Sequence, residues 1–239
     1  MCPPSSVYEH MTASVTASPP PAATLLAAGL ELRLGGIPKS ALLIDGQSLF
    51  ERLAQALRQA GIDNISAVIG SHAETLVPLA RRSGVRVVHH RVPDAQLVQS
   101  QRLAVQDHIQ HQCGRDLMLI VADLPLLTGE HVVHLLEAWR ERPSRIHAQV
   151  PMVHGVRGYP VCLSWPAVQA VAQPFLGGVR EWLIGAGGAT QVLDTVHEAY
   201  ITDLDTAGDL DSVRRRLHPL PVVWPSELRQ TAAPAQPLA

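Results

Sequence analysis

Short apolar runs that alternate with amphipathic stretches of helical length constrain the fold of this chain more than any other feature. The clearest run, Leu117–Ala122 (LMLIVA), has the length and composition of a buried strand. Similar runs occur at residues 24–28, 65–70 and 85–89. Strands that alternate with helices in this way predict βαβ units and a mainly parallel sheet, so we expect an α/β fold.

The helical stretches carry apolar residues at spacings of three and four, which places those residues on one face of a helix. Ser48 is a candidate N-cap for the first of them, which runs to Gly61. We expect helices at residues 48–61, 74–82, 97–111, around 132–139, and at 209–217. In the second half we also expect strands at residues 146–150, 161–164 and 199–202, with a flexible or tightly turned glycine-bearing segment at 177–188.

Length and composition shape the expected domain organisation. The 239 residues suffice for one domain with a proper core. We expect a mobile N-terminal tail at residues 1–21, one domain at residues 22–218, and a Pro/Ala-rich C-terminal tail at residues 219–239. Within that last tail, Val222–Trp224 is the apolar segment that we expect to dock back on the body.

Charge and cysteine usage exclude several classes of protein. The net charge of −2 gives no electrostatic reason to expect nucleic acid or an anionic membrane as a partner. No run approaches the roughly 18 apolar residues of a membrane span, and no basic region precedes the first apolar segment as in a secretory signal. Three widely spaced cysteines form no disulfide framework. We therefore expect a cytoplasmic protein that binds neither nucleic acid nor membrane.

The loop after the strand expected at residues 24–28 combines glycines with two cations. Glycines let backbone N–H groups approach a ligand closely, and fixed cations suit a polyphosphate. The residues concerned are Gly29, Gly35, Gly36, Arg33 and Lys39. No G-x-G-x-x-G follows the strand, and Pro38 stands where a Walker A loop has the glycine before its lysine. The loop is thus a nucleotide-binding candidate of another kind, or else a plain turn with two solvated cations.

This loop resembles the signature L-A-A-G-x-S/G-x-R-M-G-x-x-K of the MobA-like NTP transferases, which include the enzymes that attach CMP or GMP to molybdopterin. The matching positions are, in order, Leu26, Ala27, Ala28, Gly29, Arg33, Gly35 and Lys39. Residues 122–125 resemble the D-x-P element of the family, and residues 203–210 resemble its D-I-D-T-P-E-D-L. Residues 151–161 resemble the P-x-x-x-G-x-R-G-H-P-V stretch of the cytidylyl-type members, with Tyr159 in place of the histidine.

The resemblance implies a three-layer α/β/α fold around a mostly parallel, Rossmann-like sheet of the GT-A-like nucleotidyltransferase kind. It implies an Mg²⁺-dependent enzyme that moves NMP from CTP or GTP to a phosphate acceptor and releases pyrophosphate. The resemblance favours molybdopterin as the acceptor and CTP slightly ahead of GTP. The implied roles are catalytic for Arg33 and Lys39, nucleotide-binding for Leu26, Ala27, Ala28, Gly29, Gly35 and Gly36, acceptor-binding for Arg157 and Gly158, and metal-binding for Asp123, Asp203 and Asp205.

The positions of the aspartates in the sequence also suggest roles for them without reference to any family. Asp123 directly follows a strand, where ligands of an open parallel sheet bind, and it could hold Mg²⁺ or simply cap the next turn. Asp203 and Asp205 are two residues apart, so in extended chain their side chains point the same way. Thr206 is expected to cap the helix that follows, with Asp209 in its first turn.

Two departures from the family leave alternatives open. Glu31 places an acidic side chain in the nucleotide loop, and residues 175–180 lack the aspartate of the family's L-x-G-D-x-G-x-R. The chain could therefore be a degenerate nucleotide-binding accessory protein without turnover, or a nucleotidyltransferase that acts on a sugar phosphate or alcohol phosphate. The histidine pairs 108/111 and 131/134 are expected to be exposed helix residues and not a zinc site, because neither has zinc-ligand spacing.

Overall fold

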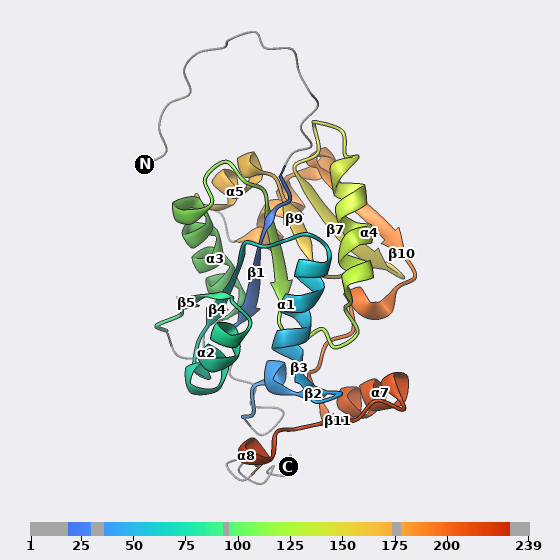
Figure 1. Cartoon of the computed structure of the whole chain (residues 1–239). Coiled ribbons are helices and arrows are strands. Elements are labelled where there is room, and N and C mark those ends of the chain that lie inside the picture. Colours follow the sequence, from blue (N-terminus) through green and yellow to red (C-terminus); the bar gives the residue numbers. More distant parts are fainter. Residues whose placement is uncertain (1–18, 30–35, 93–95, 174–177, 230–239) are drawn as a thin grey trace, which may run out of the picture.

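The computed structural model describes residues 19–29, 36–92, 96–173 and 178–229. A central twisted sheet stands between two layers of helices (Figure 1). The α/β class and the three-layer, mostly parallel architecture are confirmed.

The main sheet has eight strands in the order β10-β7-β9-β6-β1-β4-β5, with the short β8 paired to β7. β1, β4, β5 and β6 run parallel to one another, as do β7 and β10, while β9 is antiparallel to both of its neighbours. The strands are β1 (Ala22–Ala27), β4 (Ile65–Ile69), β5 (Arg86–His89), β6 (Leu117–Val121), β7 (Ala148–Val153), β8 (Val156–Arg157), β9 (Val161–Leu163) and β10 (Thr190–Thr195).

Helices cover both faces of the sheet. On one face lie α1 (Leu49–Gln59), α2 (Ala73–Arg82) and α4 (Gly129–Arg140), while α7 (Ala207–Leu217) packs into the same apolar core beyond the carboxyl end of the sheet (Figure 1). On the other lie α3 (Leu97–His111), α5 (Trp165–Val171) and α6 (Val179–Gly185). β1 serves both layers, because Leu25 belongs to the first apolar core and Leu26 to the second. Successive side chains of a strand point to opposite faces, so a strand in the middle of such a sheet is apolar at every position.

Local signals in the sequence account for the helix ends. Ser48 caps α1 in a capping box with Glu51, and Thr206 caps α7 in a capping box with Asp209, as predicted. The predicted helices at 74–82 and 97–111 correspond to α2 and α3 within one residue.

The second half of the chain differs from the prediction in several places. The segment at 177–188, expected to be flexible or tightly turned, contains the helix α6, and the helix α5 was not predicted. The predicted strand at residues 199–202 is wrong, because Glu198–Tyr200 form a short 3-10 helix, η4, that buries Ala199 and Tyr200. β10 was missed because it is an edge strand of mixed polarity, with no continuous apolar run.

The segment after α7 returns to the body. β11 (Val222–Val223) pairs with β2 (Leu43–Ile44), which in turn pairs with β3 (Gln47–Ser48), and Val222 is buried in the first core. The expected docking of Val222–Trp224 is confirmed. α8 (Ser226–Arg229) follows β11. The outer parts of both predicted tails, residues 1–18 and 230–239, lie outside the described residues.

Cys162 is a free, fully buried thiol within β9.

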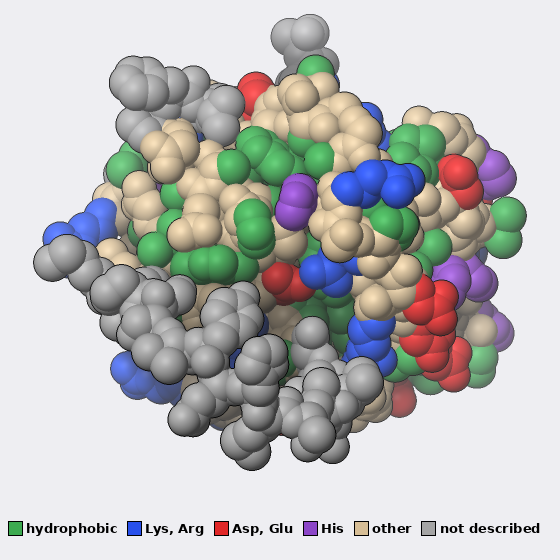
Figure 2. Space-filling model, turned by 90° about the horizontal axis from the view of Figure 1, so that it is seen from above, with side chains coloured by type: hydrophobic (Ala, Val, Ile, Leu, Met, Phe, Trp, Pro, Cys, Tyr) green, Lys and Arg blue, Asp and Glu red, His purple; other side chains and the backbone are tan. Residues whose placement is uncertain are grey.

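The surface shows no single dominant charge in the view of Figure 2, which looks down on the end of the molecule where β1 and β6 begin. Basic and acidic side chains lie there in small separate groups between apolar and polar ones. Of the helices in the described ranges, none combines the length and apolar character that a membrane crossing requires.

Candidate active site

A cleft of about 600 Å³ opens at the carboxyl ends of β1 and β6. Ligands of open α/β sheets bind at this edge, because the loops that follow parallel strands meet there. Ten of the predicted site residues line it. They are Leu26, Ala27, Ala28, Gly29, Lys39, Asp123, Arg157, Gly158, Asp203 and Asp205.

Three predicted residues are not among the described residues that line the cleft. Arg33 and Gly35 lie outside the described residues. Gly36 is described, with a positive φ of 74° that suits glycine, but it is not among the residues that line the cleft. The first half of the predicted nucleotide loop is thus at the cleft, and the position of its middle part is not described.

Asp123 stands two residues beyond β6, on the floor of the cleft. Its side chain is 23% exposed, and its Oδ1 atom is buried without a hydrogen-bond partner among the described residues. Burial raises the pKa of this carboxyl above its ordinary value, the Lys39 ammonium opposes that shift, and the charges of Asp203 and Asp205 add to it. A buried oxygen without a partner is costly, so this atom is suited to bind a cation.

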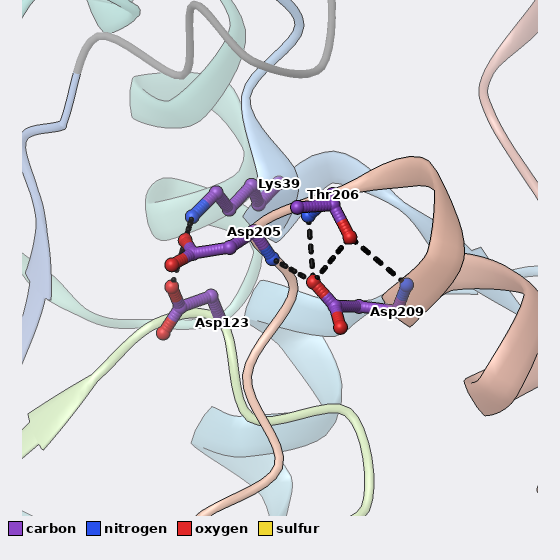
Figure 3. A network of polar contacts seen from close by, with 5 residues as sticks. All are labelled: Lys39, Asp123, Asp205, Thr206 and Asp209. Carbon is purple, nitrogen blue, oxygen red and sulfur yellow. Dashed lines mark hydrogen bonds and ion pairs between the residues drawn. The ribbon is translucent and has the colours of Figure 1, made fainter.

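Asp205 is positioned by the capping box of α7 (Figure 3). Asp209 Oδ2 accepts hydrogen bonds from the backbone N–H of Asp205 at 3.1 Å, from that of Thr206 at 2.7 Å, and from the Thr206 hydroxyl at 2.8 Å. These bonds lower the pKa of Asp209, with Thr206 as the main cause. The two aspartates at the start of α7 therefore have different roles: Asp209 fixes the backbone, and Asp205 faces the cleft.

Lys39 joins two carboxylates that lie far apart in the chain. Its Nζ atom lies 2.5 Å from Asp205 Oδ1 and 3.3 Å from Asp123 Oδ2 (Figure 3). The lysine begins η2 (Lys39–Ala41), a 3-10 turn whose three residues are all buried, and its side chain is only 11% exposed. The turn leads directly into β2 and α1, so the lysine is anchored from the body of the domain.

The carboxylates fit a hard divalent cation in chemistry and in location. Mg²⁺ and similar ions take oxygen ligands, often one or two carboxylates together with substrate phosphates. Asp123, Asp203 and Asp205 all line the cleft, and Asp123 holds a buried oxygen without a partner. In the described part of the chain, however, no three His, Cys, Asp or Glu side chains already surround one point closely enough to hold a metal. A cation would therefore have to draw these side chains together.

The opposite wall of the cleft comes from the turn between β8 and β9. A Cβ atom on Gly158 would lie 2.2 Å from the carbonyl oxygen of Tyr200, so only glycine fits there. The backbone N–H of Tyr159 donates to that same oxygen at 2.9 Å, and the Tyr159 hydroxyl accepts from Gln101 Nε2 at 3.0 Å. Arg157 and Tyr159 thus flank a glycine that is locked against η4, and both line the cleft.

Several lining residues were not predicted. Leu97 and Ser100 come from the first turn of α3, and Tyr200 and Ile201 come from η4 and its end. Their signals are weak, because the contacts join segments far apart in the chain. The histidine expectation is wrong for His108, which is 2% exposed and binds the carbonyl of Arg115 through Nε2. Burial lowers the pKa of this imidazole.

Comparison with known proteins agrees with the geometry of the site. The model of the MobA-like NTP transferase domain matches residues 23–194. The bifunctional protein GlmU of Syntrophomonas wolfei is 28% identical over 124 residues, which are 51% of this chain and 26% of that protein. This chain therefore spans about a quarter of that relative's length.

Solved structures share the fold at low sequence identity. A nucleotidyl transferase of Methanothermobacter thermautotroptrophicus has a TM-score of 0.67 at 17% identity, over 82% of this chain and 96% of that one. Rv0371c of Mycobacterium tuberculosis H37Rv, in a complex with manganese, has a TM-score of 0.60 at 21% identity, over 81% of this chain and 97% of that one.

Proposed function

This chain belongs to the MobA-like NTP transferase family and is thus a transferase, and we propose that it moves a nucleotidyl group from an NTP to a phosphate-bearing acceptor. One observation carries the proposal. A single cleft is lined by the start of the nucleotide loop, by Lys39, by three carboxylates and by Arg157. These are the parts that the reaction needs, in the place where an α/β sheet binds its ligands.

The finer identity of the substrates is also a proposal. The similarity of residues 151–161 to cytidylyl-type members supports CTP ahead of GTP, and the family resemblance supports molybdopterin as the acceptor. Mg²⁺ is the proposed cation, supported by the carboxylate set and by the manganese complex of a protein with the same fold. We place the reaction in the cytoplasm because nucleoside triphosphates are its proposed substrates.

The proposed reaction is an in-line displacement at phosphorus. An acceptor phosphate oxygen bonds to the α-phosphorus while the bond from that phosphorus to the bridging oxygen of pyrophosphate breaks. The backbone of residues 26–29 would bind the nucleotide, and Arg33 and Lys39 would stabilise the charge that grows on the pyrophosphate. Arg157 and the backbone at Gly158 would orient the acceptor.

Asp123 and Asp205, with Asp203, would hold the divalent cation. When bound, that cation neutralises charge on the phosphates. The protein itself forms no covalent bond in this scheme, so its contribution is position and charge.

A thermal-shift series tests the proposal. CTP, GTP, ATP and UTP are each added with Mg²⁺, and a nucleotide that binds only the folded state raises the melting temperature. We expect CTP or GTP to give the largest shift. The proposal fails if none of the four nucleotides changes the melting temperature.

Pyrophosphate release with molybdopterin, and with sugar phosphates and alcohol phosphates as comparison acceptors, identifies the second substrate. Turnover with a sugar phosphate alone would replace molybdopterin as the acceptor. Nucleotide binding without turnover on any acceptor would make the chain an accessory protein.

A further inference from the structure

Lys39 is the single lysine of this chain, which has 19 lysine and arginine residues in total. All other basic side chains of that count are arginine. The one ammonium group of a side chain is therefore found in the cleft, nearly buried, and bound to two carboxylates at once. This position calls for a property that arginine lacks.

Lysine and arginine differ in the way they hold an anion. The guanidinium is a rigid planar fork, whereas the ammonium is a compact charge on a flexible stem that can serve one anion after another. Lys39 has two such partners within reach of the cleft: the carboxylates that it contacts now, and the phosphates that the proposed nucleotide would bring. Its backbone stays fixed in η2, so only the side chain needs to move.

The present contacts of Lys39 are those expected of a bound cation. The ammonium bridges Asp205 Oδ1 and Asp123 Oδ2, two oxygens of the proposed metal site. Asp123 has one buried carboxylate oxygen and Asp203 and Asp205 line the same cleft, so a positive charge among them offsets the repulsion between these groups. While the Lys39 ammonium contacts these two oxygens, a second cation cannot bind them.

We propose that Lys39 is an internal stand-in for the divalent cation, and that it leaves the carboxylates for the nucleotide phosphates when the metal and the nucleotide bind. The second half of this exchange, in which Lys39 moves to the nucleotide phosphates, rests on the proposed function. Its consequence is cooperativity. The cation competes with Lys39 in the free protein, and the nucleotide removes that competition, so each ligand strengthens the binding of the other by the same factor.

Manganese binding tests the first half without any nucleotide. Mn²⁺ is titrated into the free protein and followed by electron paramagnetic resonance of the unbound ion, for the natural chain and for Lys39→Met. We expect the variant to bind Mn²⁺ at least ~5-fold more tightly, which is the lower end of typical coupling between sites. Equal or weaker binding by a folded Lys39→Met would overturn the proposal.

Arg157→Met is the matched control. It also replaces one cation in the lining of the cleft by methionine, but Arg157 makes no described contact with Asp123 or Asp205. We expect its affinity for Mn²⁺ in the free protein to stay close to that of the natural chain. An equal gain in both variants would mean that net charge alone sets the affinity, and the stand-in role would be rejected.

The single lysine permits a second measurement on the unmodified protein, which holds even if Lys39→Met does not fold. Biosynthetic labelling with [ε-¹³C]lysine gives one side-chain methylene signal. We expect the largest change in its chemical shift when Mg²⁺ and a non-hydrolysable CTP or GTP analogue are present together. A signal that stays in place with both ligands bound would overturn the exchange.

The two proposals fail separately. Absence of any nucleotide effect on melting temperature overturns the proposed function, and tighter Mn²⁺ binding by Lys39→Met would still support the stand-in role. The converse result, nucleotide binding with no gain in Mn²⁺ affinity, overturns the stand-in role alone.

Discussion

At the scale of single residues, Asp123 meets two opposing conditions. Its burial disfavours the charged form of the carboxyl, yet the proposed chemistry needs that charge next to the phosphates. The positive charge of Lys39 stabilises the charged form of the Asp123 carboxyl against the effect of burial. No pattern in the sequence could indicate the contact, because the two residues are separated by 84 positions. Both residues could be identified from the sequence, but Lys39 was assigned to the phosphates and Asp123 to the metal.

Replacement of Asp123 by asparagine should remove activity without unfolding the protein. Asn keeps the shape of the side chain but loses the charge that would hold the cation, and loss of one charge-stabilising group typically lowers kcat by ~100-fold or more. Pyrophosphate release measures the effect. Asp211→Asn, at a site on α7 with 60% side-chain exposure, is the control and should retain activity. Natural activity in Asp123→Asn would exclude this carboxylate from the reaction.

Gly158→Ala should destabilise the protein and disturb the acceptor wall. The added Cβ would overlap the Tyr200 carbonyl, and overpacking of this kind typically costs about 1–3 kcal/mol. Urea unfolding measures the loss. Gly188→Ala serves as a control, because its Cβ would meet nothing within 4 Å and its φ is not positive. Equal stability of the two variants would contradict the close approach of the two backbones at Gly158.

At the scale of elements, the predictions succeeded where the signal is local. β4, β6, α1 and α2 were found because a strand in a buried sheet is apolar throughout and a covering helix is apolar on one face. The strand predicted at residues 199–202 is wrong. The prediction followed the general preference of Tyr and Ile for strands. Here packing against the first core decides instead, with Tyr200 fully buried. The edge strand β10 carried too little apolar sequence to stand out.

The capping box of α7 predicts how stability depends on pH. The pKa of Asp209 is lowered in the folded state, so its contribution is complete above the unfolded pKa and is lost as pH falls through the lower folded pKa. We therefore expect the stability difference between the natural chain and Asp209→Asn to be present at pH 6 and reduced at pH 3. Urea unfolding at both pH values measures it. A difference that grows on acidification would refute this reading.

At the scale of the whole molecule, a segment near the end of the chain pairs with a segment near its beginning. β11 pairs with β2, which directly follows the turn that carries Lys39, and the backbone N–H of Asp45 donates to the Pro221 carbonyl at 2.8 Å. Asp203 and Asp205 also come from this late part of the chain. Composition pointed to a tail beyond residue 218 and could only hint at this pairing, because the partner strand has two residues.

Removal of residues 219–239 should weaken both the fold and the site. The deletion uncovers the side of β2 and removes Val222, which is 5% exposed, from the first core. We expect a lower melting temperature and weaker nucleotide binding, because β2, which follows η2, loses its pairing with β11. Deletion of residues 230–239 alone keeps β11 and is the control. An unchanged melting temperature after the longer deletion would show that the pairing contributes no stability.

The reversed direction of β9 limits how this cleft can change during evolution. Because β9 runs against β6, the residues before it reach the same edge as Asp123, which follows β6. A residue inserted beside Tyr159 would disturb the hydrogen bond from the Tyr159 N–H to the Tyr200 carbonyl and the close approach of Gly158 to that same oxygen. We therefore expect this side of the cleft to gain new acceptors more readily by point substitution than by loop lengthening, which would cost these contacts.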